Sequence, residues 1–123
     1  MEGKFATAIN CIDGRAQMPV NEWIRKSLGA DYVDTITEPG VDRFLSHGGE
    51  EAIKKKVMIS VNAHHSSAIV VAGHHDCAGN PVSKEEHLKH IKKCVEIIES
   101  WKLPVRVVGL WVNEQWQVEV VES

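Results

Sequence analysis

Two short segments of the chain carry residue types that can bind a metal ion. Cys11 is followed by Asp13 and Arg15 in a Cys-x-Asp-x-Arg pattern, and His74 is followed by Cys77 in a His-x-x-Cys pattern. Two thiolates and one imidazole form a ligand set that suits Zn²⁺. Three protein ligands with an open fourth position are typical of a catalytic zinc site, whereas structural sites are usually closed by four. The chemistry to consider is therefore that of a zinc-activated water.

The two patterns differ in how specific they are. A His three residues before a Cys arises by chance far more readily than Cys-x-Asp-x-Arg in a chain of this composition. Taken alone, Cys11 can be a buried thiol at the end of a strand. Asp13 and Arg15 can equally be a turn carboxylate and its ion-pair partner. The occurrence of both patterns, each after a predicted strand, favours a metal site.

The elements that must position these residues follow from hydrophobic periodicity. Short apolar runs predict strands at 5–12, 32–37, 67–73 and 105–112, and apolar residues at helical spacing predict helices at 19–28, 49–63 and 83–101. A final alternating run at 115–121 is typical of an edge strand, with Trp116, Val118 and Val120 facing inward. This order predicts an α/β fold, a three-layer sandwich with a mainly parallel sheet of four to five strands and an antiparallel last edge strand.

The predicted topology brings the two patterns together. In a parallel sheet, ligands bind just beyond the carboxyl ends of the strands. Cys11 ends the first predicted strand, and His74 directly follows the third. We therefore expect Cys11, His74 and Cys77 to meet at one edge of the sheet, with Asp13 beside them.

Composition limits the other functions. The 123 residues, 43% hydrophobic and 25% charged, predict one globular domain spanning 1–123. A net charge of −3 argues against a nucleic-acid partner. Residues 1–10 lack the layout of a secretory signal and no apolar run is long enough for a membrane span, so a cytoplasmic location without membrane contact is expected. Three cysteines, an odd number, favour thiols or metal ligands over a disulfide framework.

Three other classes of protein are excluded by missing motifs. A cysteine phosphatase needs an Arg six residues after its nucleophile, and Gln17 stands at that position relative to Cys11. The glycine fingerprint of dinucleotide-binding proteins and the lysine motif of phosphate-binding loops do not occur in the chain.

Cys-x-Asp-x-Arg followed by Gly-His-x-x-Cys in a small parallel α/β sheet resembles the β-class carbonic anhydrases, over about residues 5–112. The resemblance implies that Cys11, His74 and Cys77 bind one Zn²⁺ per chain and that Asp13 and Arg15 form the catalytic dyad. Zinc-bound hydroxide, oriented by Asp13, would then hydrate carbon dioxide to bicarbonate. The resemblance also implies a homodimer or higher homo-oligomer, with each active site near the subunit interface.

The same resemblance leaves alternatives open. In the family, the Asp of the dyad can leave its Arg and close the site as the fourth zinc ligand. Relatives with this core hydrolyse carbonyl sulfide or carbon disulfide, and a non-catalytic zinc-binding protein is a third reading. The chain departs from the family at residues 37–40, Thr-Glu-Pro-Gly, where members tend to have an Arg-Asn-Ala-Gly-like turn. Only ten residues precede Cys11, so the helical arm that commonly wraps a partner subunit is not expected.

The remaining histidines and the third cysteine are expected to be structural, and none is assigned as a proton shuttle. We expect a surface position for His75, a helix-end pair far from the site for His64 and His65, solvent-facing positions for His47, His87 and His90, and a core position for Cys94.

Overall fold

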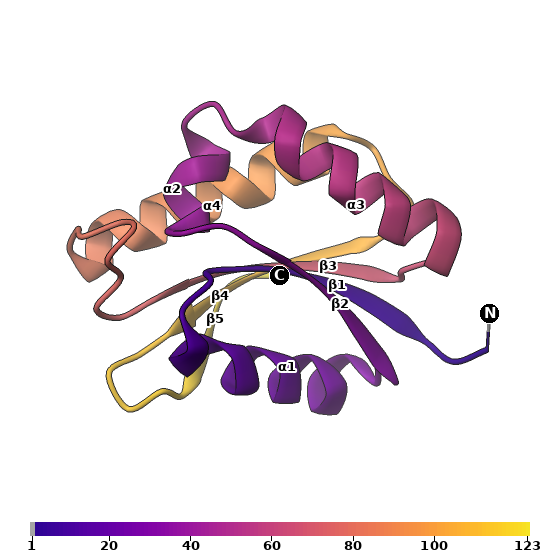
Figure 1. The fold of residues 1–123 in the computed structure, drawn as a ribbon, viewed down its shortest axis with the longest axis horizontal. Coiled ribbons are helices and arrows are strands. Elements are labelled where there is room, and N and C mark those ends of the chain that lie inside the picture. The colour runs from indigo at the N-terminus through magenta and orange to yellow at the C-terminus, as the bar shows by residue number, and fades with distance from the viewer. Residues whose placement is uncertain (1) are drawn as a thin grey trace.

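The computed structural model describes residues 2–123 and confirms the predicted fold class. Five strands form one sheet in the order β2-β1-β3-β4-β5, and helices cover both of its faces (Figure 1). Neighbouring strands are parallel except for β5, which pairs antiparallel with β4 at the edge. The strands are β1 Phe5–Asn10, β2 Tyr32–Thr37, β3 Ala68–His74, β4 Arg106–Val112 and β5 Val118–Glu122, and the helices are α1 Gly14–Leu28, α2 Val41–Ser46, α3 Glu50–His64 and α4 Lys84–Ser100.

The helices are divided unequally between the two faces of the sheet. Helix α1 lies alone below the sheet in Figure 1, whereas α2, α3 and α4 lie above it. Along β3, Val70 faces α1, while Ile69 and Val71 face the other three helices. Both sides of this central strand are therefore buried, as its unbroken apolar sequence predicts. None of the helices within residues 2–123 is long and apolar enough to span a membrane.

Helix α1 begins five residues earlier than expected, at Gly14, so the prediction that Pro19 lies in its first turn is wrong. The helix begins there because Asp13 is its N-cap: the side chain accepts a hydrogen bond from the backbone N–H of Arg15. Gly29, in a left-handed conformation with φ 68°, ends the helix. The candidate dyad is thus built into the first turn of α1.

Two elements at the carboxyl edge of the sheet differ from the prediction. Helix α2 was not predicted, because a helix of six residues is too short to show helical periodicity. Strand β5 begins at Val118, and Trp116 lies in the turn before it with a positive φ of 58°. Val120 is 52% exposed, so its predicted inward position is wrong.

The expectation that His87 and His90 face solvent is also wrong, because both belong to a polar network beneath the loops at this edge. His87, 1% exposed, donates from Nδ1 to Oδ2 of Asp42 at 2.6 Å. The amide of Asn80 donates to Oδ1 of Asp42 at 3.1 Å and to Nδ1 of the half-buried His90 at 2.9 Å. Cys94 is buried in the core as predicted, and its thiol donates to the backbone carbonyl of Asp42 at 3.1 Å.

Candidate metal centre

The structure brings Cys11, His74 and Cys77 together beyond the carboxyl ends of two central strands. Cys11 follows β1, His74 is the last residue of β3, and Cys77 lies in the loop after β3. Their potential ligand atoms all lie within 4.8 Å of one another, and the two Sγ atoms are 3.9 Å apart. All three residues are buried. A single ion at this edge can reach all three.

The imidazole of His74 is oriented for a metal by a hydrogen bond at its other nitrogen. Its Nδ1 lies 2.7 Å from the carbonyl oxygen of His75, which can only accept, so Nδ1 carries the proton. Nε2 therefore has a free lone pair, and it is buried without any hydrogen-bond partner. A buried polar atom without a partner is rare and costly, whereas a metal ion bound at Nε2 would satisfy it. Together with the two thiols, this atom fits Zn²⁺.

The environment of Cys11 favours the thiolate that a metal requires. The hydrogen bond shared with Cys77 lowers the pKa of the Cys11 thiol, and the backbone N–H of Gly40 lowers it further against the opposing effect of burial. The same shared bond raises the pKa of Cys77, and burial adds to this effect. Without a metal, the two thiols of Cys11 and Cys77 therefore lose one proton readily and keep the second, which a bound cation would displace.

The turn after β2 supplies one of these donors. Gly40 donates its backbone N–H to Sγ of Cys11 at 3.4 Å. Its φ is +56°, and a Cβ added there would lie 2.4 Å from the carbonyl carbon of Gly79. Only glycine fits at this close approach, so the turn after β2 and the loop after Cys77 pack directly against each other behind the two sulfur atoms.

Asp13 and Arg15 form a bidentate pair beside the three candidate ligands. Arg15 donates from Nε to Oδ1 of Asp13 at 3.0 Å and from Nη2 to Oδ2 at 2.7 Å. These hydrogen bonds lower the pKa of the Asp13 carboxyl to about 2. Oδ2 of Asp13 lies 3.9 Å from the unpartnered Nε2 of His74. The carboxylate is thus within reach of the position that a metal ion would occupy.

Arg15 has two further partners that the sequence analysis did not single out. Asp76 accepts from Nη1 through its carboxylate at 3.2 Å and from Nη2 through its backbone carbonyl at 3.1 Å. The ring of Trp116 lies against the guanidinium, with Cζ 4.5 Å from the ring centroid. Asp76 lies inside the His-x-x-Cys segment, so the sequence already places it near the candidate metal site. Trp116 lies in a predicted strand, and nothing in the sequence links it to Arg15.

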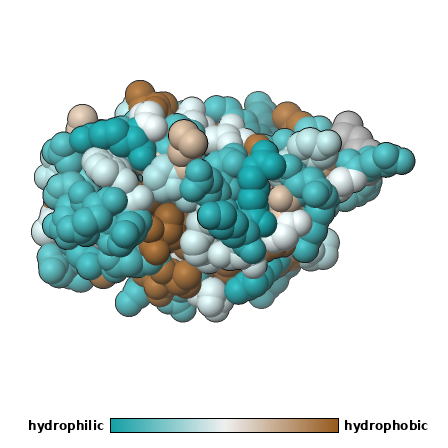
Figure 2. Space-filling view, turned by 90° about the horizontal axis from the view of Figure 1, so that it is seen from below, coloured by the Kyte–Doolittle hydropathy of each residue, from teal (hydrophilic) through white to brown (hydrophobic). Residues whose placement is uncertain are grey.

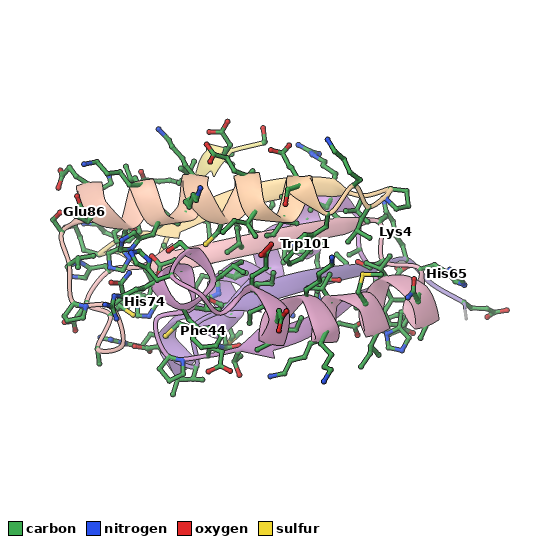
Figure 3. All side chains as sticks on the ribbon, turned by 90° about the horizontal axis from the view of Figure 1, so that it is seen from above. Lys4, Phe44, His65, His74, Glu86 and Trp101 are labelled. Carbon is green, nitrogen blue, oxygen red and sulfur yellow. The ribbon has the colours of Figure 1, made fainter. Side chains whose placement is uncertain are left out.

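The other histidines lie away from the three ligand atoms or at the surface. Figure 3 places His65 near Lys4 at the end of the molecule opposite His74, and the helix-end position of His64 and His65 is confirmed. His75 is exposed as predicted. His47 is also exposed, and its ring lies edge-on to that of His90 at 5.0 Å.

Replacing Arg15 by glutamine is expected to raise the pKa of the Asp13 carboxyl from about 2 toward its ordinary value of 3.8, because the hydrogen bonds from Arg15 are the largest cause of the lowering. Because the pKa of Asp13 is lower in the folded protein than in the unfolded chain, its ionised carboxylate stabilises the fold above about pH 4. This stabilisation is lost as the pH falls from about 4 toward 2. NMR titration of the carboxyl carbon in zinc-free protein measures the shift. Arg25→Gln, far from the site, serves as the control, and a pKa that stays near 2 in Arg15→Gln would contradict the assignment.

An α/β sheet with two thiols, an imidazole and a guanidinium-held carboxylate at its carboxyl edge defines a small domain with a candidate metal centre. The family described as "Putative carbonic anhydrase" matches residues 1–122, and the chain belongs to this family. The resemblance inferred from the two motifs is thereby confirmed. No curated protein matches the chain.

Solved structures with the same fold are β-carbonic anhydrases of low sequence identity. The isoform I enzyme of Trichomonas vaginalis is 14% identical to this chain, with a TM-score of 0.64. The match covers 95% of this chain and 82% of the Trichomonas chain. A structure from Sordaria macrospora, whose two β-carbonic anhydrases are described as tetrameric, is 12% identical with a TM-score of 0.63, covering 98% and 81%. That of Aspergillus fumigatus is 14% identical with a TM-score of 0.56, covering 95% and 74%. At these identities the likeness shows the fold.

Proposed function

We propose that residues 1–123 act as a single-domain zinc enzyme that catalyses the reversible hydration of carbon dioxide to bicarbonate. The observation that carries the proposal is the unpartnered, buried Nε2 of His74 between two thiols, with an ionised carboxylate 3.9 Å away. Membership of the carbonic anhydrase family supports the same reaction.

Cys11, His74 and Cys77 would hold one Zn²⁺ per chain. When bound, the ion lowers the pKa of a coordinated water toward neutrality and so supplies a hydroxide nucleophile. The two thiolates neutralise the charge of the ion, and the N–H of Gly40 and the carbonyl of His75 fix Cys11 and His74 in place. Because thiolates donate more charge than imidazoles, this ligand set makes a weaker acid of the water than three histidines would, and activity is expected to increase from pH 7 to pH 9.

Asp13 would orient the nucleophile. With a pKa of about 2, its carboxylate is ionised throughout the neutral range and can only accept hydrogen bonds. A water or hydroxide beside it must therefore point a proton at Asp13, which turns a lone pair toward carbon dioxide. Arg15 occupies both carboxylate oxygens from the other side and holds the group in this position.

We propose further that the chain works as a homodimer or a higher homo-oligomer in the cytoplasm. Beside the site, a groove between α1 and β2 is lined by Asn10, Met18 and Thr35, among others. Met18 in this groove is 69% exposed, and Ile12, just before α1, is 58% exposed. Figure 2, which views the molecule from the α1 side, shows hydrophobic groups reaching the surface among hydrophilic ones. A second subunit over this surface would bury these side chains and complete the walls of the substrate pocket.

Stopped-flow hydration of carbon dioxide at pH 7 and pH 9 tests the function, on protein whose zinc content has been measured. We expect turnover well above the buffer rate, dependent on zinc and higher at pH 9. The metal-free protein and the same sample after zinc is restored are the matched controls. Zinc-loaded protein without turnover would overturn the proposal. Turnover of carbonyl sulfide or carbon disulfide by that sample would identify a sulfur-gas hydrolase, and inertness toward all three gases a non-catalytic zinc protein.

A further inference from the structure

We propose that Trp116 is a positioning residue, which holds Arg15 against Asp13 and so keeps Asp13 from closing the metal centre as a fourth ligand. This inference rests on the proposed function only in taking Cys11, His74 and Cys77 as metal ligands. It assigns a role to the turn between β4 and β5, which contributes none of the five motif residues.

The turn that carries Trp116 is braced by its own hydrogen bonds. The side-chain oxygen of Asn113 accepts from the backbone N–H groups of Gln115 and Gln117 at 3.0 Å each. The N–H of Trp116 donates to the carbonyl of Asn113 at 2.9 Å. Trp116 itself has a φ of +58°, a conformation that bulky residues rarely adopt. Such local strain persists only where the surroundings enforce it, so the backbone that carries the indole is held at a defined place.

At that place the indole covers one face of the Arg15 guanidinium. The distance of 4.5 Å from Cζ to the ring centroid is within the range of a cation–π interaction. The same ring lies 6.2 Å from the ring of His74 and 6.4 Å from that of His75. Trp116 therefore touches both sides of the site, the dyad and the strand end that carries a ligand.

The edges of the guanidinium are held separately from its face. Four of its five N–H groups donate, two to Asp13 and two to Asp76. The donors to Asp76 are different N–H groups from those to Asp13, so the two acidic residues do not compete for the same hydrogen atoms. Arg15 is thus fixed by Asp76 and Trp116 even when Asp13 is elsewhere.

This arrangement bears on which partner Asp13 takes. Its Oδ2 lies 2.7 Å from Nη2 of Arg15 and 3.9 Å from Nε2 of His74, so a small rotation would bring it from the guanidinium to a metal ion. The Arg15 side chain is 47% exposed, and without the indole only its hydrogen bonds to the acidic residues would hold the guanidinium against turning into solvent. An anchored Arg15 is already placed to donate two hydrogen bonds to Asp13. A mobile Arg15 would first have to lose conformational entropy to form the same bonds. Removing the indole would favour the closed site.

Binding of thiocyanate to cobalt-substituted protein tests this, because an anion changes the visible spectrum of Co²⁺ only when the fourth position is open to it. The variants are Trp116→Phe, which keeps an aromatic face, and Trp116→Leu, which does not. We expect Trp116→Phe to bind thiocyanate nearly as the unaltered protein does, and Trp116→Leu to bind it about three- to tenfold more weakly, the loss expected of one cation–π contact. Gln117→Ala, beside Trp116 in the same turn, is the control and should change nothing.

A double variant tests whether the effect passes through Asp13. Adding Asp13→Asn to Trp116→Leu replaces the carboxylate by a poor ligand and should restore thiocyanate binding. Equal affinity in Trp116→Leu and the unaltered protein, equal weakening in the Phe and Leu variants, or failure of Asp13→Asn to restore binding would each overturn the proposal. Should Trp116→Leu fail to fold, Trp116→Met fills similar space without an aromatic face and carries the same expectation.

The cobalt experiment also separates this inference from the proposed function. Zinc-loaded protein that hydrates no carbon dioxide, but whose cobalt form shows the expected order of affinities, would disprove the reaction and leave the role of Trp116 standing. Normal hydration of carbon dioxide with unchanged thiocyanate affinity in Trp116→Leu would support the proposed reaction and disprove the role of Trp116.

Discussion

Replacing Cys77 by alanine is expected to abolish tight zinc binding and, with it, hydration of carbon dioxide. Cys77 carries one of the three buried candidate ligand atoms, and its loop offers no other sulfur. Because loss of a residue that only supports a ligand already lowers metal affinity by about 10- to 100-fold, loss of a ligand itself should lower it by more than about 100-fold. Zinc content after dialysis and the stopped-flow rate measure the two effects.

Cys94 provides the matched control for that experiment. It is the remaining buried free thiol outside the site, and it donates to the carbonyl of Asp42. Cys94→Ala should lower the free energy of unfolding by about 1–2 kcal/mol through a small cavity and a lost hydrogen bond, while zinc content and hydration stay unchanged. Full zinc occupancy in Cys77→Ala would mean that the ligand set is misassigned.

Replacing Asp42 by alanine is expected to lower the free energy of unfolding by about 3–5 kcal/mol, the usual cost of removing one partner of a buried pair. Asp42 and His87 are each 1% exposed, and the carboxylate also accepts from Asn80. Alanine would leave both donors without an acceptor and open a cavity. Urea unfolding at a fixed zinc concentration measures the loss.

Two further variants bracket the Asp42 result. Asp42→Asn keeps the volume and an acceptor oxygen, so it should cost less than alanine. Lys89→Ala removes an exposed ion pair with Glu86 on the same helix as His87 and should change the free energy of unfolding by less than about 0.5 kcal/mol. A loss below about 1 kcal/mol in Asp42→Ala would show that the buried network contributes little.

The meeting of the three candidate ligands could be predicted from the sequence because it depends on the ends of strands. Cys11 and His74 each close a strongly apolar run, and parallel strands place such positions at one edge of a sheet. Contacts made by backbone atoms or by distant residues could not be predicted in the same way. The N–H of Gly40 and the ring of Trp116 reach the site from other loops, and no local pattern encodes either contact.

His87 illustrates a case in which the pattern existed but was misread. It lies four residues before Ile91 and seven before Cys94, on the same buried face of α4. Helical periodicity alone therefore assigns it to the core. A histidine at such a position needs a partner, and Asp42 lies 45 residues earlier in the chain, on the short helix that periodicity did not detect.

Because Asp13 caps the start of α1, any movement of its carboxylate toward the candidate metal centre would also affect the stability of that helix. One carboxylate oxygen accepts from both the backbone N–H and the Nε of Arg15, at 2.9 and 3.0 Å. If Asp13 moved to a metal ion, the first turn would lose its cap as well as its ion pair, and a lost cap costs about 0.5–2 kcal/mol. Loss of these hydrogen bonds would oppose such a movement of the carboxylate, and fraying of the first turn of α1 would accompany it.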